Sequence, residues 1–72
     1  MNFNPLTTYA NAGRIAARAA HRNDGALANS THQWLRLATR LEEPGYANQA
    51  RNAFSEAYRA ESDETSSKTF FL

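Results

Sequence analysis

Alanine-rich stretches with few β-branched residues run through most of this chain, and they restrict its fold more than any other feature. Alanine loses no side-chain entropy in a helix, whereas a strand is stabilised by packing larger and often branched side chains. The three glycines and two prolines fall near the expected breaks between helical segments. The sequence therefore predicts an all-α chain.

The length of 72 residues suits one small domain, whose core supplies only about 3–5 kcal/mol. Cysteine is absent, so neither a disulfide nor a thiolate zinc site is available as a staple. Self-association into a homodimer, or binding to another protein, is the remaining support. The chain shows no export signal and no apolar run of roughly 20 residues, and we therefore expect a cytoplasmic protein without a membrane partner.

Three helices are expected, over about residues 5–22, 25–43 and 46–61, forming a small three-helix bundle within residues 1–61. Asn4 and Pro5 suit the cap and the first position of the first helix. A narrow face of mostly small side chains follows at three- and four-residue spacing: Leu6, Tyr9, Gly13, Ala16, Ala17 and Ala20. Gly13 should let another helix approach unusually closely.

The turn at 22–25 contains Asn23, Asp24 and Gly25, which are residue types that tolerate the left-handed conformation at a helix end. Two starts then fit the second helix. Ser30 begins a capping-box pattern, but an earlier start near Asp24 places Leu27, Trp34 and Leu41, spaced by seven, on one face. We favour the earlier start, and Pro44 with Gly45 should end the helix.

The third helix places alanine and aromatic side chains on one face: Ala47, Ala50, Ala53, Phe54, Ala57 and Tyr58. Residues 62–72 are mostly polar and are expected to form a flexible, disordered tail. That tail ends in an apolar tripeptide, Phe70, Phe71 and Leu72, which either folds back or is recognised by another molecule.

Residues 31–62 resemble one tetratricopeptide hairpin. The resemblance rests on the order and spacing of Trp34, Leu37, Ala38, Leu41, Gly45, Ala50, Phe54 and Ala57. It implies a protein-interaction module in which helix faces hold a peptide or a partner helix, and it does not imply an enzyme. The same residues also fit an ordinary antiparallel helical hairpin that serves as the core of the fold.

Charge is divided unevenly along the chain. Up to Leu41 there are five arginines and one acid, Asp24, whereas six acids and three basic residues follow. Arg14, Arg18 and Arg22 are spaced by four and form a row about 12 Å long on the first helix, and Arg36 and Arg40 repeat that spacing on the second. Guanidinium groups in such rows suit acidic side chains or phosphates.

Three interpretations of the arginine rows stay open. They bind an acidic surface of a partner protein, they bind RNA as in the architecturally similar small helical protein Rop, or they form a solvated face paired with Glu42, Glu43 or Glu56. The low net charge and the acidic second half disfavour nucleic acid. We expect a small regulator or inhibitor that binds protein through these arginines, with the exposed edge of Trp34 as an anchor.

Catalytic and metal-binding patterns are absent from the sequence. His21 and His32 match no ligand spacing, and no nucleophile triad, phosphate loop or carboxylate pair is recognisable. We therefore expect no enzymatic activity, no metal and no cofactor.

Overall fold

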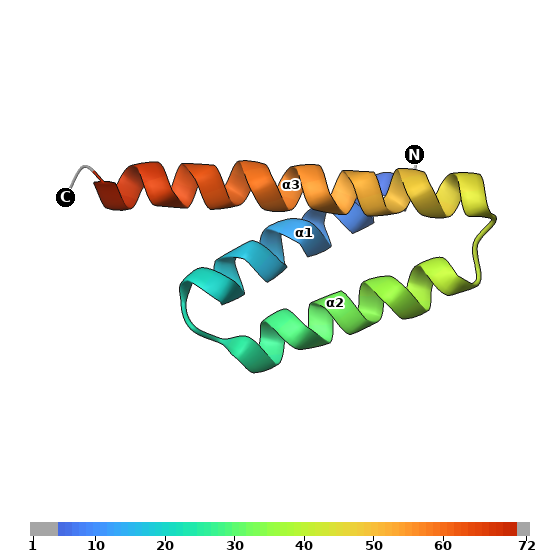
Figure 1. Cartoon of the computed structure of the whole chain (residues 1–72), viewed down its shortest axis with the longest axis horizontal. Coiled ribbons are helices and arrows are strands. Elements are labelled where there is room, and N and C mark those ends of the chain that lie inside the picture. Colours follow the sequence, from blue (N-terminus) through green and yellow to red (C-terminus); the bar gives the residue numbers. More distant parts are fainter. Residues whose placement is uncertain (1–4, 71–72) are drawn as a thin grey trace.

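The computed structural model describes the backbone of residues 5–70 and the side chains of residues 6–64. It contains three helices, α1 (Pro5–His21), α2 (Gly25–Arg40) and α3 (Pro44–Phe70) (Figure 1). Over the described backbone there is no strand, so the predicted all-α, three-helix class is confirmed.

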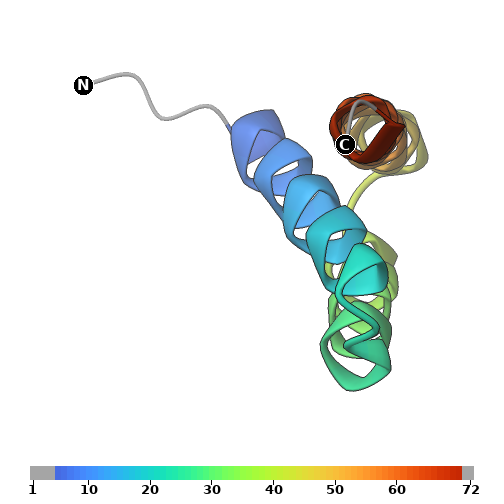
Figure 2. The ribbon, with the colours of Figure 1, turned by 90° about the vertical axis from the view of Figure 1, so that its left-hand side faces the viewer.

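Helix α1 lies between the other two helices. It packs most extensively against α3 and less extensively against α2, while α2 and α3 touch each other only slightly. In Figure 1, α1 and α2 run antiparallel to each other, and α3 crosses α1, which Figure 2 shows with α3 seen end-on. One broad surface of α2 is therefore left without a helix against it.

The first turn ends α1 at His21 with a Schellman motif. Asn23 adopts the left-handed conformation, with φ of 61°. Its N–H donates to Ala20 O at 3.2 Å, and the Asp24 N–H donates to Ala19 O at 2.8 Å. These bonds satisfy carbonyls that the helix end leaves free. Asparagine is the residue other than glycine that tolerates this conformation best.

Helix α2 starts at the earlier of its two predicted positions. The Asp24 carboxylate accepts a hydrogen bond from Leu27 N at 3.1 Å and so caps the helix, which begins at Gly25. The helix ends at Arg40, earlier than the predicted Glu43. Leu41 is its C-terminal cap, and Glu42 N closes the last turn by donating to Thr39 O at 3.2 Å.

Helix α3 begins at Pro44 rather than at the predicted Tyr46, and it continues past the predicted end at Glu61 to Phe70. Proline fits the first helical position because its missing N–H is not needed there. No glycine or proline follows Gly45, so nothing in the sequence interrupts the helix. Helix thus covers 62–70 of the predicted tail, and residues 71–72 lie outside the described part of the chain.

The core is built mainly from alanine. Among the described side chains, the only buried hydrophobic residues larger than alanine are Tyr9 and Phe54. The buried alanines are Ala12, Ala16, Ala17, Ala19, Ala47, Ala50 and Ala57. The predicted faces of α1 and α3 are thus largely correct, but Ala20 is exposed and Ala19 takes its place because α1 also turns a side toward α2.

Helices α1 and α3 approach each other very closely at Gly13. A β-carbon added there would collide with the carbonyl oxygen of Phe54 on α3. Ala12, Ala16 and Phe54 form one buried cluster around this point. We call Ala12, Gly13, Ala16 and Phe54 the α1–α3 seam. The prediction that Gly13 permits close helix packing is confirmed.

Helix pairing differs from what the tetratricopeptide resemblance implies. In that pattern the helix containing Trp34 packs on the helix containing Phe54. Here Phe54 packs chiefly against α1, and the Trp34 ring lies beside Tyr9 of α1. The structure is a three-helix all-α arrangement in which α3 packs more extensively on α1 than on α2.

Candidate interaction surface

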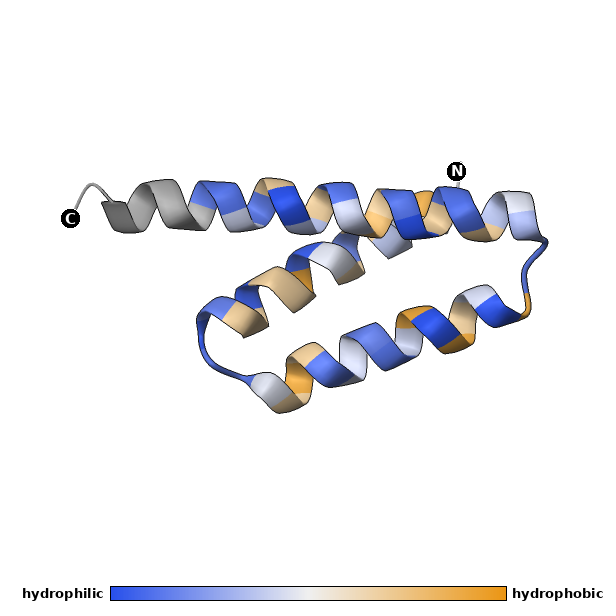
Figure 3. Cartoon of the chain, in the orientation of Figure 1, coloured by the Kyte–Doolittle hydropathy of each residue, from blue (hydrophilic) through white to orange (hydrophobic). Residues whose placement is uncertain are grey.

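The outer surface of α2 carries large apolar side chains that the fold leaves in solvent. Trp34 is 39% exposed, Leu37 is 62% exposed and Leu41 is 91% exposed. Spacings of three and four residues put them on one side of the helix, and we call these residues the α2 apolar stripe. Figure 3 shows hydrophobic and hydrophilic segments alternating along α2. A contiguous apolar surface of this kind is typical of a binding site.

The opposite side of α2 explains why the stripe stays exposed. Leu35 packs against the buried cluster of the α1–α3 seam, and Thr39 is the buried polar residue of this helix. The Thr39 hydroxyl donates to Leu35 O at 2.8 Å, so its polar group is satisfied within its own helix. The side chains buried on this side of α2 are small or of medium size. The face that carries Leu27, Trp34 and Leu41 does not form the core.

Arg36 and Arg40 lie next to Leu37, and on the side of α2 that faces away from Trp34. Together with Gln33 and Leu37 they line a hollow of about 380 Å³ that is formed by α2 residues alone. Both arginines are exposed. From Gly25 to Leu41 the sequence contains no acidic residue, so nothing on α2 itself neutralises them.

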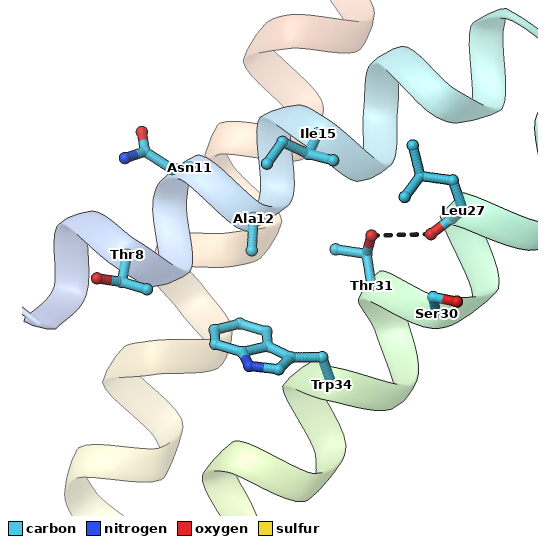
Figure 4. Close-up of a pocket in the computed structure, with 8 residues that line it drawn as sticks. All are labelled: Thr8, Asn11, Ala12, Ile15, Leu27, Ser30, Thr31 and Trp34. Carbon is cyan, nitrogen blue, oxygen red and sulfur yellow. Dashed lines mark hydrogen bonds between the residues drawn. The ribbon is translucent and has the colours of Figure 1, made fainter.

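A second hollow, of about 440 Å³, lies between α1 and α2, and we call it the α1–α2 groove (Figure 4). Both helices line it at three- and four-residue intervals: Thr8, Asn11, Ala12 and Ile15 from α1, and Leu27, Ser30, Thr31 and Trp34 from α2. None of these side chains carries a charge. The Thr31 hydroxyl donates to Leu27 O at 2.8 Å and is therefore satisfied.

Trp34 belongs to both the stripe and the groove. Its ring centroid lies 5.3 Å from that of Tyr9, with the two planes tilted by 40°. Tyr9 is buried, and its burial raises the pKa of its hydroxyl above the ordinary value. The charge of Glu42, and to a smaller extent that of Tyr46, raises this pKa further. One side of the indole is thus fixed by an aromatic neighbour while the rest stays accessible.

The arginine row of α1 is partly used within the fold. Arg18 Nε donates to Glu61 Oε1 of α3 at 2.7 Å. This hydrogen bond raises the pKa of the Arg18 guanidinium, and the negative charge of the Glu61 carboxylate is the second cause of the rise. Arg14 Nη1 donates to Asn11 Oδ1 at 2.7 Å, and Arg22 is exposed. Internal pairing was one of the open interpretations of the row, and the partner that Arg18 has is Glu61 rather than Glu42, Glu43 or Glu56.

Four of the five predicted arginines fall into two groups in the structure, and the fifth, Arg22, is exposed just after the end of α1. Arg14 and Arg18 lie beside α3, since Arg14 lines a shallow hollow with Ala53 and Glu56 and Arg18 is paired with Glu61. Arg36 and Arg40 lie on α2. The two pairs therefore line different hollows, and Arg18 has a partner within the fold.

The two histidines contact α3 at separate places. His21 Nε2 lies 3.0 Å from Ser62 Oγ, and the His32 ring lies 5.3 Å from the ring of Phe54 and 6.0 Å from that of Tyr58. Within residues 6–64, no group of three or more histidines and acids is close enough to hold a metal ion. The side chains of Phe70, Phe71 and Leu72, predicted as a recognition element, lie outside the described residues.

Ile15 was missed by the sequence analysis. It is 46% exposed and forms the α1 end of the groove lining. The sequence does contain a signal for it, because Ile15 lies seven residues after Thr8 and four after Asn11, away from the Tyr9 and Gly13 face. Its exposure depends on where α2 packs, which periodicity does not give.

Comparison with protein-family models, curated proteins and solved structures finds no match to this chain. Among the described residues, no helix combines the length and the hydropathy needed to cross a lipid bilayer.

Proposed function

We propose that this chain is a small protein-interaction module, a regulator or inhibitor that binds an acidic surface of a partner protein. The outer surface of α2 carries the proposal, because exposed Leu37 lies next to Arg36 and Arg40 on a helix without acids, and Trp34 and Leu41 are exposed on the same helix and its cap.

Apolar burial would supply most of the affinity. Covering a large apolar side chain that was exposed is worth about 1.5–3 kcal/mol, and tryptophan is among the commonest hot-spot residues. The α2 apolar stripe provides three such side chains within two helical turns. These residues suit the centre of an interface.

The arginines would supply orientation and partner choice. Exposed guanidinium groups beside an apolar centre attract a surface of opposite charge and repel a basic one. Arg36 and Arg40 are the principal groups in this proposal, with Arg14 and Arg22 as additional contacts. Arg18 takes part only if a partner carboxylate replaces Glu61, to which it is bonded.

Affinity capture with the full chain from its native cells tests the proposal. We expect wild type to capture a protein with an acidic surface, and expect the double variant Arg36→Glu with Arg40→Glu to lose it. The matched control is Arg51→Glu with Arg59→Glu, which makes the same charge change at exposed positions of α3 and should capture normally. Equal capture by both double variants would refute the role of the α2 arginines.

The nucleic-acid alternative is separated by salt dependence. Binding through arginine–phosphate contacts weakens steeply as salt rises. A gel-shift assay at low salt with RNA and DNA should show no complex if the chain binds protein. A complex that weakens with salt and with Arg36→Glu and Arg40→Glu would establish the Rop-like alternative instead.

A further inference from the structure

A hollow between α2 and α3 has a wall made largely of aromatic rings, and we call it the α2–α3 hollow. Its volume is about 320 Å³, and known small-molecule sites span about 300–1,000 Å³. The lining combines an imidazole, two aromatic rings, a hydroxyl and a guanidinium: His32 of α2, and Phe54, Ser55, Tyr58 and Arg59 of α3. The α2 apolar stripe and the α1–α2 groove share no residue with it.

We propose that the α2–α3 hollow binds a small planar aromatic anion, and that the ligand is a free nucleoside monophosphate. The base of the nucleotide stacks on the Tyr58 ring, and its phosphate accepts hydrogen bonds from Arg59. This is a second function of the chain, because none of the lining residues belongs to the surface proposed above to bind protein.

Three rings meet at the hollow and favour a flat ligand. The Phe54 and Tyr58 rings are nearly parallel, with planes 19° apart and centroids separated by 6.5 Å. The His32 ring lies 5.3 Å from Phe54 and 6.0 Å from Tyr58. Phe54 is buried, whereas Tyr58 is half-buried and His32 is exposed. The accessible parts of these last two rings therefore offer a stacking surface to a nucleobase.

Hydrogen-bond donors beside the rings favour a phosphate. Ser55 and Arg59 lie one helical turn apart on α3, and both side chains are exposed. Among residues 6–64, the structure records no hydrogen bond or ion pair for either side chain. A guanidinium can offer two parallel N–H groups to a phosphate, and a hydroxyl adds another donor. The ring surface and these donors together match the two parts of a nucleotide.

The charges around the hollow are mainly positive. Arg36 lies one turn after the lining histidine on the same face of α2, which contains no acid. On α3, Glu56 lines a different hollow, the one between α1 and α3. Asp63 lies one turn beyond Arg59, and the structure records no ion pair between them. Two guanidinium groups and one carboxylate leave a field that attracts an anion.

The number of stacking surfaces distinguishes a free nucleotide from a nucleic-acid strand. A strand is bound by successive aromatic side chains along a charged groove, one base after another. The other aromatic contacts of the described residues form a separate cluster, in which Tyr9 contacts Trp34 and Tyr46. The α2–α3 hollow is thus a single stacking surface, and it suits a single nucleotide.

The test uses the full chain and adenosine 5′-monophosphate at low salt. Backbone amide shifts in an NMR titration show where the ligand binds and how tightly. Two control ligands separate the contacts, because adenosine lacks the phosphate and ribose 5-phosphate lacks the base. We expect the monophosphate to shift the amides of residues 32 and 54–59, and expect each control ligand to bind at least about tenfold more weakly.

Two pairs of variants test the residues. Arg59→Gln should weaken nucleotide binding about tenfold, because it removes a charged donor from the phosphate. Arg51→Gln makes the same change at an exposed position outside the hollow, and it should bind as wild type does. Tyr58→Leu should also weaken binding about tenfold, whereas Tyr58→Phe keeps the ring and should stay within about twofold of wild type. Circular dichroism checks that each variant is folded.

Several results would overturn the proposal. Equal affinities of wild type and Arg59→Gln, or of adenosine and its monophosphate, would exclude a phosphate contact. Equal affinities of ribose 5-phosphate and the nucleotide would exclude stacking. Binding of a short oligoadenylate without binding of the monophosphate would assign the hollow to nucleic acid instead. The absence of any amide shift up to about 1 mM nucleotide would also refute it.

Discussion

The α1–α3 seam and the outer surface of α2 use apolar residues in opposite ways. In the seam, small side chains and Gly13 bring two helices so close that no β-carbon fits against Phe54. On α2, the larger Leu37 and Leu41 have no helix against them. The seam thus buries mostly small side chains, whereas large side chains of the α2 apolar stripe are exposed.

This contrast separates folding from recognition. A helix pair that packs through alanine gains close contact but has little room for bulky groups, so bulky groups on other faces remain in solvent. Those groups are then available to a partner. In this chain the residues that stabilise the fold and those proposed to bind are therefore nearly distinct, and they can be changed separately.

The largest expected effect comes from the one large apolar side chain at the seam. Phe54→Ala should lower the free energy of unfolding by about 3–5 kcal/mol, because it removes a buried ring and leaves a cavity. For a chain this small, that loss approaches the whole stability. Urea unfolding followed by circular dichroism measures it.

Leu41→Ala is the matched control for that substitution. Leu41 is almost fully exposed, so the change should alter stability by no more than about 0.5 kcal/mol. Comparable losses of unfolding free energy for the two variants would show that Leu41 is buried in solution. The contrast between the seam and the α2 apolar stripe would then not hold.

A smaller effect is expected at the closest helix approach. Gly13→Ala should destabilise the protein by about 1–3 kcal/mol, because the added methyl meets the carbonyl of Phe54 and forces α1 and α3 apart. Gly25→Ala, where a β-carbon meets nothing, should be neutral or slightly stabilising. Thermal unfolding of the two variants measures this difference. Equal melting temperatures for Gly13→Ala and Gly25→Ala would contradict close packing at Gly13.

The smallest expected effect on stability is at Tyr46, in the buried region. Tyr46 OH is buried and has no hydrogen-bond partner among the described residues. Tyr46→Phe removes this unsatisfied group and should raise stability by about 1 kcal/mol, as judged by chemical denaturation. A loss of stability would mean that the hydroxyl has a partner, and Tyr58→Phe, at a half-buried tyrosine, serves as the comparison.

Local chemistry made much of the fold predictable. The turn at Asn23, the start of α2 near Asp24 and the close approach at Gly13 each follow from one residue type in one backbone environment. The end of α3 was not predictable in this way. Polar composition suggested a tail after Glu61, but a segment without glycine or proline can continue a helix that is already formed.

The candidate site was only partly predictable, because it depends on how the helices pack. The sequence pointed to Trp34, Arg36 and Arg40, which lie on the surface now proposed. It did not reveal that Arg18 bonds to Glu61, forty-three positions away. Nor did it reveal the groove, since the lining needs α1 and α2 in one relative position.

A core made of methyl groups has a thermodynamic consequence. Unfolding exposes less apolar surface here than in a domain with a leucine-rich core, and both the heat-capacity change and the denaturant m-value scale with that surface. The stability curve should therefore be shallow and the melting transition broad. A partner that covers Trp34 and Leu37 would add apolar burial to the folded state, and it would make unfolding more cooperative as well as less frequent.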